Sequence, residues 1–174
     1  MSFINVEIKA RSSNPEKIRK ILEDNNARHI GLDNQIDTYF KIKDGRLKLR
    51  EGNIENNLIY YNRPDREGPK QSEIILYKTR RDSGLKEILF KSMDISVIVD
   101  KKRDIYLIDN VKFHIDEVIG LGNFVEIEAI DSEGIRNSEE LLEQCRFYMK
   151  LLKINEDELI SCSYSDFLLQ QQNP

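Results

Sequence analysis

The chain has 174 residues, of which 39% are apolar, and its 31 acidic and 27 basic side chains give a net charge of −4. This length fits one domain with a sizeable core, covering residues 1–174. The weakly negative charge argues against the broad basic surface of a nucleic-acid-binding protein, so nucleic acid is not an expected partner. No apolar run approaches the roughly 20 residues that span a membrane, and the first residues do not resemble a secretory leader. We therefore expect a cytoplasmic protein without a membrane partner, with reduced thiols at Cys145 and Cys162.

Residues 3–11 alternate between apolar and polar side chains, which predicts a β-strand. The polar face of this strand carries both signs of charge, at Glu7, Lys9 and Arg11. Similar alternation, interrupted by turn residues, predicts further strands over residues 28–43, 46–51, 56–63, 73–80, 95–103 and 104–108.

Polar caps and apolar stripes predict four helices. Asn14 is the expected N-cap of the first helix, and Pro15 suits its first helical position. The other three are residues 82–93, a helix capped by the pair Asn137 and Glu140, and a final helix that begins at the pair Asn155 and Glu158 and runs through Leu169.

A β-hairpin is predicted near the C-terminal third of the chain, with arms over residues 111–118 and 124–130 and a glycine-rich turn between them. Glu126 and Glu128 share one face of the second arm, about 7 Å apart, because side chains alternate along a strand. Two parallel carboxylates repel each other unless a cation lies between them or water solvates them. The hairpin alone is consistent with either a metal site or a solvated face.

About eight strands joined mostly by short turns predict an α+β fold in which an antiparallel sheet closes into a barrel. The predicted helices need apolar surface to cover, so we expect them to pack outside the barrel. The charged strand faces would then line the lumen, which a metal bound to the acids and an oligophosphate bound to the bases would neutralise. The alternative is an ordinary apolar interior with the charges in solvent.

Short motifs spread over nearly the whole chain resemble those of the CYTH (triphosphate tunnel metalloenzyme) superfamily. These motifs are Asn5-Val-Glu-Ile-Lys-Ala-Arg11, Gln35-x-Asp-x-Tyr-Phe40, Leu47-Lys-Leu-Arg50, Tyr60-Tyr-x-Arg63, Lys102-Arg103, His114-x-Asp116 and Leu121-Gly-x-Phe-x-Glu-x-Glu128. The superfamily includes class IV adenylate cyclases and triphosphatases that act on thiamine triphosphate or inorganic tripolyphosphate.

The resemblance implies roles for individual residues. Metal ligands are expected at Glu7, Glu126 and Glu128, and catalytic groups at Lys9, Arg103 and Asp116. Substrate-binding bases are expected at Lys48, Arg50, Arg63, Arg11, Lys78 and Lys102. Asn5 departs from the pattern, because it stands where the family has its first signature Glu.

The resemblance also implies a triphosphate substrate, Mg²⁺ or Mn²⁺ as cofactor, and a homodimer. The reaction most similar to this pattern is that of class IV adenylate cyclase, which converts ATP to cyclic AMP and pyrophosphate. Hydrolysis of thiamine triphosphate, tripolyphosphate or a nucleoside triphosphate is the alternative, because both reactions need the same phosphate clamp. A non-catalytic polyphosphate-binding module and a purely structural protein are two further alternatives.

Overall fold

The computed structural model describes residues 2–62, 70–81 and 83–172. Arg63, one of the predicted substrate-binding residues, lies outside the described residues. Among the helices in these ranges, none combines the length and apolar character needed to cross a membrane.

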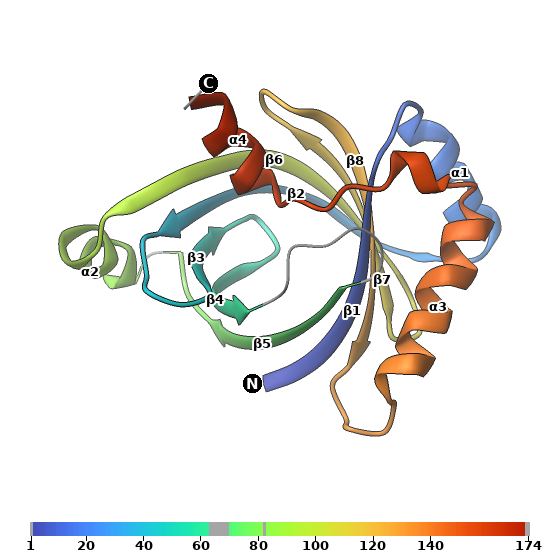
Figure 1. Cartoon of the computed structure of the whole chain (residues 1–174), viewed down its shortest axis with the longest axis horizontal. Coiled ribbons are helices and arrows are strands. Elements are labelled where there is room, and N and C mark those ends of the chain that lie inside the picture. Colours follow the sequence, from blue (N-terminus) through green and yellow to red (C-terminus); the bar gives the residue numbers. More distant parts are fainter. Residues whose placement is uncertain (1, 63–69, 82, 173–174) are drawn as a thin grey trace.

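Eight antiparallel strands form a closed barrel in the order β1-β5-β4-β3-β2-β6-β7-β8 (Figure 1). The strands are β1 (Ser2–Arg11), β2 (Arg28–Phe40), β3 (Arg46–Glu51), β4 (Asn56–Asn62), β5 (Lys70–Lys78), β6 (Ile95–Ile108), β7 (Val111–Val118) and β8 (Gly122–Asp131). The barrel closes because β1 pairs with β5 along one edge and with β8 along the other. This architecture confirms the predicted α+β fold with an antiparallel barrel.

Four helices lie around the barrel: α1 (Pro15–Asp24), α2 (Leu85–Ser92), α3 (Ser138–Leu151) and α4 (Tyr164–Gln172). Helix α1 begins as predicted, with Pro15 in its first turn and the Asn14 side chain accepting a hydrogen bond from the Lys17 amide. Helix α3 has the predicted capping box, in which Asn137 and Glu140 each accept a hydrogen bond from the other's backbone amide.

The ends of several predicted elements differ from the structure by up to three residues, and two predictions differ more substantially. The strands expected over residues 95–103 and 104–108 are one continuous strand, β6, because alternation runs unbroken through the junction and Asp104 turns outward to Arg19, 2.8 Å away. The capping box of Asn155 and Glu158 starts only a short 3₁₀ turn, Glu156–Glu158, and α4 begins later. The intervening chain instead runs beside β1, where the Ile160 amide donates to the Lys9 carbonyl oxygen.

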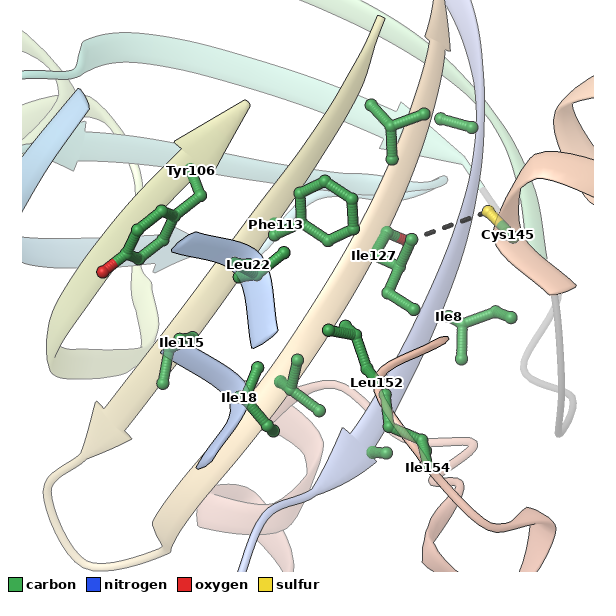
Figure 2. Close-up of a cluster of buried hydrophobic side chains, with 14 of the residues drawn as sticks. Ile8, Ile18, Leu22, Tyr106, Phe113, Ile115, Ile127, Cys145, Leu152 and Ile154 are labelled. Carbon is green, nitrogen blue, oxygen red and sulfur yellow. Dashed lines mark hydrogen bonds between the residues drawn. The ribbon is translucent and has the colours of Figure 1, made fainter. Parts of the chain in front are cut away.

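The main apolar core lies between the outer face of the barrel and the helices α1 and α3 (Figure 2). Ile18 and Leu22 of α1 and Cys145 of α3 are almost completely buried against outward-facing side chains of β1, β7 and β8. Burial of this apolar surface on the outside stabilises the barrel without using its lumen. The predicted inversion is therefore confirmed: the helices cover the apolar faces of these strands, and the polar faces point inward.

Candidate active site

The barrel encloses a cavity of about 130 Å³, large enough for several water molecules. The charged side chains that line it are Glu7, Lys9, Asp37, Lys48, Arg50, Glu55, Lys101, Arg103, Lys112, Glu126 and Glu128. These come from every strand of the barrel except β4 and β5, or from the turn between β3 and β4. Since buried charges are costly without partners, the ion pairs among them decide what the cavity can bind.

One wall of the cavity gathers three cations around a single carboxylate, Asp37 on β2, which is 1% exposed. Its oxygens accept from the Lys48 ammonium at 2.8 Å, from the Lys101 ammonium at 2.8 Å, and from Arg50 through Nε at 2.8 Å and Nη2 at 2.9 Å. Burial raises the pKa of Asp37, but Arg50, Lys101 and Lys48 together outweigh it and hold the pKa well below its usual value. We call Asp37, Lys48, Arg50 and Lys101 the basic wall.

Lys101 is the most deeply buried cation of the basic wall, with 2% of its surface exposed. Burial lowers the pKa of its ammonium to about 7; Asp37 opposes this shift, while Arg50 and Arg103 add to it. The charge of this lysine therefore changes near neutral pH, and an additional anion in the cavity would favour the charged form.

Arg103 on β6 joins the basic wall to the hairpin strands. It donates to the Asp116 carboxylate through Nε at 2.8 Å and through Nη2 at 2.6 Å, and Nη2 also donates to Glu126 at 2.6 Å. The Tyr164 hydroxyl, from the start of α4, donates to Asp116 at 2.8 Å. Burial raises the pKa of Asp116, but Arg103 outweighs it and holds the pKa below the usual value. Asp116 thus orients the guanidinium from behind.

Glu126 lies among basic groups. The Lys9 ammonium is 2.6 Å from its Oε1, and Arg103 Nη2 is 2.6 Å from its Oε2. The His114 Nδ1 lies 3.2 Å from the same Oε2. Burial raises the pKa of Glu126, but Lys9 and Arg103 outweigh it and hold the pKa well below the usual value. This carboxylate is already neutralised by the protein.

The remaining acids face each other across neighbouring strands. Glu7 on β1 is the register partner of Glu128 on β8, and both side chains line the cavity. Like charges directly opposite on adjacent strands destabilise a sheet unless a cation or a hydrogen bond compensates. The Asn5 amide donates to Glu128 Oε1 at 2.6 Å, whereas the buried Asn5 Oδ1 has no hydrogen-bond partner. We call Asn5, Glu7 and Glu128 the acidic wall.

The sequence from residue 4 to residue 164 matches the family described as CYTH domain. The chain belongs to the CYTH family. A Methanocaldococcus jannaschii CYTH relative named "Putative adenylate cyclase" is 29% identical over 178 residues, which cover 93% of this chain and 97% of that protein. The expected family membership is thus confirmed.

Two solved structures share this barrel fold. A Pyrococcus horikoshii protein has a TM-score of 0.78 at 24% identity, covering 93% of this chain and 98% of the other. A Hippeastrum protein, described as a "Putative adenylyl cyclase" with a dominant triphosphatase activity, has a TM-score of 0.61 at 14% identity, covering 99% of this chain and 97% of the other. At these identities the two structures support the fold alone.

The acidic wall fits a hard divalent cation of the kind that the CYTH resemblance implies. Its donors are carboxylate oxygens and one amide oxygen, which suit Mg²⁺ or Mn²⁺. The unpartnered, buried Asn5 Oδ1 is an acceptor that such an ion could satisfy. The described part of the chain contains no ready cluster of three or more His, Cys, Asp or Glu side chains for a metal. A cation would therefore be held by Glu7 and Glu128 together with its own waters or substrate oxygens.

Most of the predicted site residues converge as expected in this CYTH barrel. The cavity is lined by seven of them, namely Glu7, Lys9, Lys48, Arg50, Arg103, Glu126 and Glu128. Asp116 lies directly behind them through its contact with Arg103. Their catalytic, binding and metal-holding roles remain predictions.

Three predicted substrate-binding bases do not line the cavity. Lys102 is on the outer face of β6 beside Glu117, 3.7 Å away, because alternation turns it opposite to its neighbours Lys101 and Arg103. Lys78 is exposed at the last residue of β5. Arg11 is exposed at the end of β1, where its guanidinium carbon lies 5.2 Å from the centre of the Phe124 ring.

The sequence reasoning missed four charged residues of the cavity: Asp37, Glu55, Lys101 and Lys112. Strict alternation from Arg103 would have selected Lys101 in place of Lys102, and alternation from His114 would have selected Lys112. Asp37 stands inside the motif Gln35-x-Asp-x-Tyr-Phe40, but only the structure shows that it holds three cations. Glu55 follows β3 in a turn, where no periodic pattern applies.

Proposed function

We propose that this protein is a divalent-metal-dependent enzyme that acts on a triphosphate bound in the barrel. The observation that carries the proposal is the division of one enclosed cavity into a basic wall and an acidic wall. A triphosphate is a linear polyanion that binds divalent cations, so it matches both walls at once. Neither a neutral ligand nor a bare cation would compensate both sets of charges.

The chain's own residues have distinct tasks in this proposal. Lys48, Arg50 and Lys101 bind phosphate oxygens, and Arg103, oriented by Asp116, neutralises charge that grows as a P–O bond breaks. Glu7 and Glu128 would hold the cation, which supplies Lewis-acid polarisation of a phosphoryl oxygen when bound. Asp37, Lys101 and Arg103 are almost completely buried, which strengthens their charge interactions.

The favoured reaction is that of an adenylate cyclase. In this reaction the ribose 3′-oxygen of ATP forms a bond to the α-phosphorus, the bond from that phosphorus to the bridging oxygen breaks, and pyrophosphate leaves with that oxygen. The hydroxyl proton passes to solvent or to a basic group. The name of the M. jannaschii relative, whose sequence aligns over nearly its full length, supports this choice.

Triphosphate hydrolysis is the second candidate, supported by the dominant triphosphatase activity described for the Hippeastrum neighbour. Water would form a bond to the terminal phosphorus, the bond from that phosphorus to its bridging oxygen would break, and orthophosphate and the remaining diphosphate would be the products. The same basic wall serves this reaction, because the two reactions differ in the position of the nucleophile and not in the charge that must be stabilised.

Product analysis separates these candidates. The protein is incubated with ATP, thiamine triphosphate or tripolyphosphate and with Mg²⁺ or Mn²⁺, and products are identified by chromatography and phosphorus NMR. Cyclic AMP with pyrophosphate supports the cyclase, and orthophosphate supports the triphosphatase. The variant Glu7→Gln should lose turnover, whereas Glu117→Gln, which removes an exterior carboxylate, should keep it. Absence of turnover with every substrate and both ions would overturn the enzymatic proposal. The remaining interpretation would then be a non-catalytic polyphosphate-binding module.

A further inference from the structure

The turn between β3 and β4 is tied to the barrel by a buried carboxylate that the proposed chemistry does not use. Asp33 on β2 is 0% exposed, and its oxygens accept from the backbone amides of Asn53, Ile54 and Glu55. The last two of these bonds are both 2.9 Å long. Three amide donors on one carboxylate fix the backbone of the turn, since a carboxylate acceptor makes stronger hydrogen bonds than a neutral one.

The same carboxylate requires a glycine at the start of the turn. A Cβ atom on Gly52 would lie 2.5 Å from Asp33 Oδ1, so only glycine permits this close approach. The buried Gln35 amide then links the two acids, donating to Asp33 Oδ2 at 2.8 Å and to Glu55 Oε2 at 3.2 Å. Asp33 and Gln35 therefore determine where the Glu55 side chain points.

Glu55 points into the cavity and bridges it. Its Oε2 accepts from Arg50 Nη1 on β3 at 2.9 Å, and its Oε1 accepts from Lys112 on β7 at 3.2 Å. Strands β3 and β7 are separated by β2 and β6 in the barrel order, so the bridge spans the lumen. Burial raises the pKa of Glu55, but Arg50 and Lys112 outweigh it and lower the pKa, so the group is a carboxylate at neutral pH.

Arg50 uses different nitrogens for its two acidic partners. Nε and Nη2 donate to Asp37, whereas Nη1 donates to Glu55. Loss of the Glu55 contact would leave the guanidinium oriented by Asp37, with Nη1 available to another anion. Lys112 has 35% of its side chain exposed, so water can solvate it when Glu55 moves.

We propose that Glu55 is a resident anion that occupies the place of one substrate phosphate group, with Asp33 as its positioning residue. This inference rests on the proposed function and refines its substrate class. A single phosphate gains little by replacing a carboxylate that already neutralises Arg50 and Lys112. Displacement of Glu55 lowers the affinity for either anion by the same factor. Only a phosphate chain that also reaches Lys48 and Lys101 gains enough additional ion pairs to offset this cost, so orthophosphate binds too weakly to compete.

Calorimetric titration without divalent ions tests this exchange, with tripolyphosphate and orthophosphate as probes. The isosteric variant Glu55→Gln should bind tripolyphosphate about tenfold more tightly than the wild type and should bind orthophosphate more tightly by a similar factor. The matched control Glu117→Gln removes one exterior carboxylate and should bind both anions within about twofold of the wild type. Equal or weaker tripolyphosphate binding by Glu55→Gln would overturn the inference.

Two further variants complete the test. Asp33→Asn should lower the melting temperature and yet bind tripolyphosphate more tightly than the wild type, whereas a purely structural Asp33 would lower both stability and affinity. Should Glu55→Gln not fold, Glu55→Asp retracts the carboxylate by one methylene and should show the same order of affinities; unchanged affinity there would also overturn the inference. If the wild type itself binds no tripolyphosphate with or without Mn²⁺, the proposed function fails first.

Discussion

The two walls of the cavity arrange their charged side chains differently. On the basic wall, Asp37 satisfies three cations at distances of 2.8–2.9 Å, so the cluster is held in place without a ligand. On the acidic wall, Glu7 and Glu128 face each other as register partners on β1 and β8. The proposed phosphate clamp is therefore already held together by ion pairs within the protein, and the proposed cation would bind at the acidic wall.

The largest expected effect concerns the basic wall. Asp37→Ala removes the shared partner of three buried cations, and we expect it to lower the free energy of unfolding by about 3–5 kcal/mol. Urea denaturation checks this value. Tripolyphosphate should recover part of the lost stability, because it can replace the missing anion. A loss below about 1 kcal/mol would show that the cations do not depend on Asp37.

The two glutamates of β8 should respond in opposite directions. Glu126→Gln removes the carboxylate that pairs with Lys9 and leaves Arg103 with Asp116 alone, and it should cost at least about 2 kcal/mol of unfolding free energy. Glu128→Gln relieves a like-charge pair while keeping an acceptor for Asn5, and should raise the metal-free stability by about 0.5 kcal/mol. In exchange, Glu128→Gln should lose the thermal stabilisation that Mn²⁺ gives the wild type. Equal destabilisation by both variants would show that Glu126 and Glu128 do not differ in how their charges are compensated.

The next prediction concerns Lys101 and the pH dependence of the free energy of unfolding. Its folded-state pKa of about 7 lies below the value of roughly 10.4 for an unfolded chain, so between these values the unfolded state binds more protons and stability rises with pH. Relative to Lys101→Met, the wild type should gain up to about 1.4 kcal/mol per pH unit between pH 7 and 9. Parallel stability curves for the two proteins over this range would show that Lys101 titrates normally.

The smallest effect is expected outside the barrel. Lys102→Ala should change the unfolding free energy by no more than about 0.5 kcal/mol, because its ion pair with Glu117 is exposed and long. The affinity for tripolyphosphate should also stay within about twofold of the wild type. A tenfold loss would contradict the outward placement of this side chain and restore it to the substrate-binding set.

Alternation along the strands predicted which charged side chains share a face, such as Glu7 with Lys9 and Glu126 with Glu128, because the side-chain period of a strand is fixed. The resemblance to the CYTH superfamily was needed to favour a charged lumen over a solvated face. The choice of Lys102 went against that same period, since Lys101 and not Lys102 shares a face with Arg103 within the predicted strand over residues 95–103. A capping box was correctly recognised at Asn155, but its helix ended after one short turn because tertiary pairing with β1 prevailed.

Contacts between residues distant in sequence could not be predicted from the sequence alone. Asp33 caps a turn that begins 19 residues later in the chain, and Glu55 contacts Lys112 on a strand that follows 57 residues later. Neither contact follows from local propensity or periodicity, since both depend on how the strands are ordered around the barrel. The division into two walls likewise requires the register that pairs Glu7 with Glu128.

The most direct measurement is a crystal structure of the protein with tripolyphosphate and Mn²⁺, with the metal located by its anomalous scattering. We predict a manganese peak within about 2.0–2.6 Å of oxygens from Glu7 and Glu128, and phosphate density in contact with Lys48, Arg50 and Lys101. Glu55 should have moved away from Arg50 Nη1. Manganese or phosphate bound on the outer surface, with the cavity unchanged, would contradict the central claim.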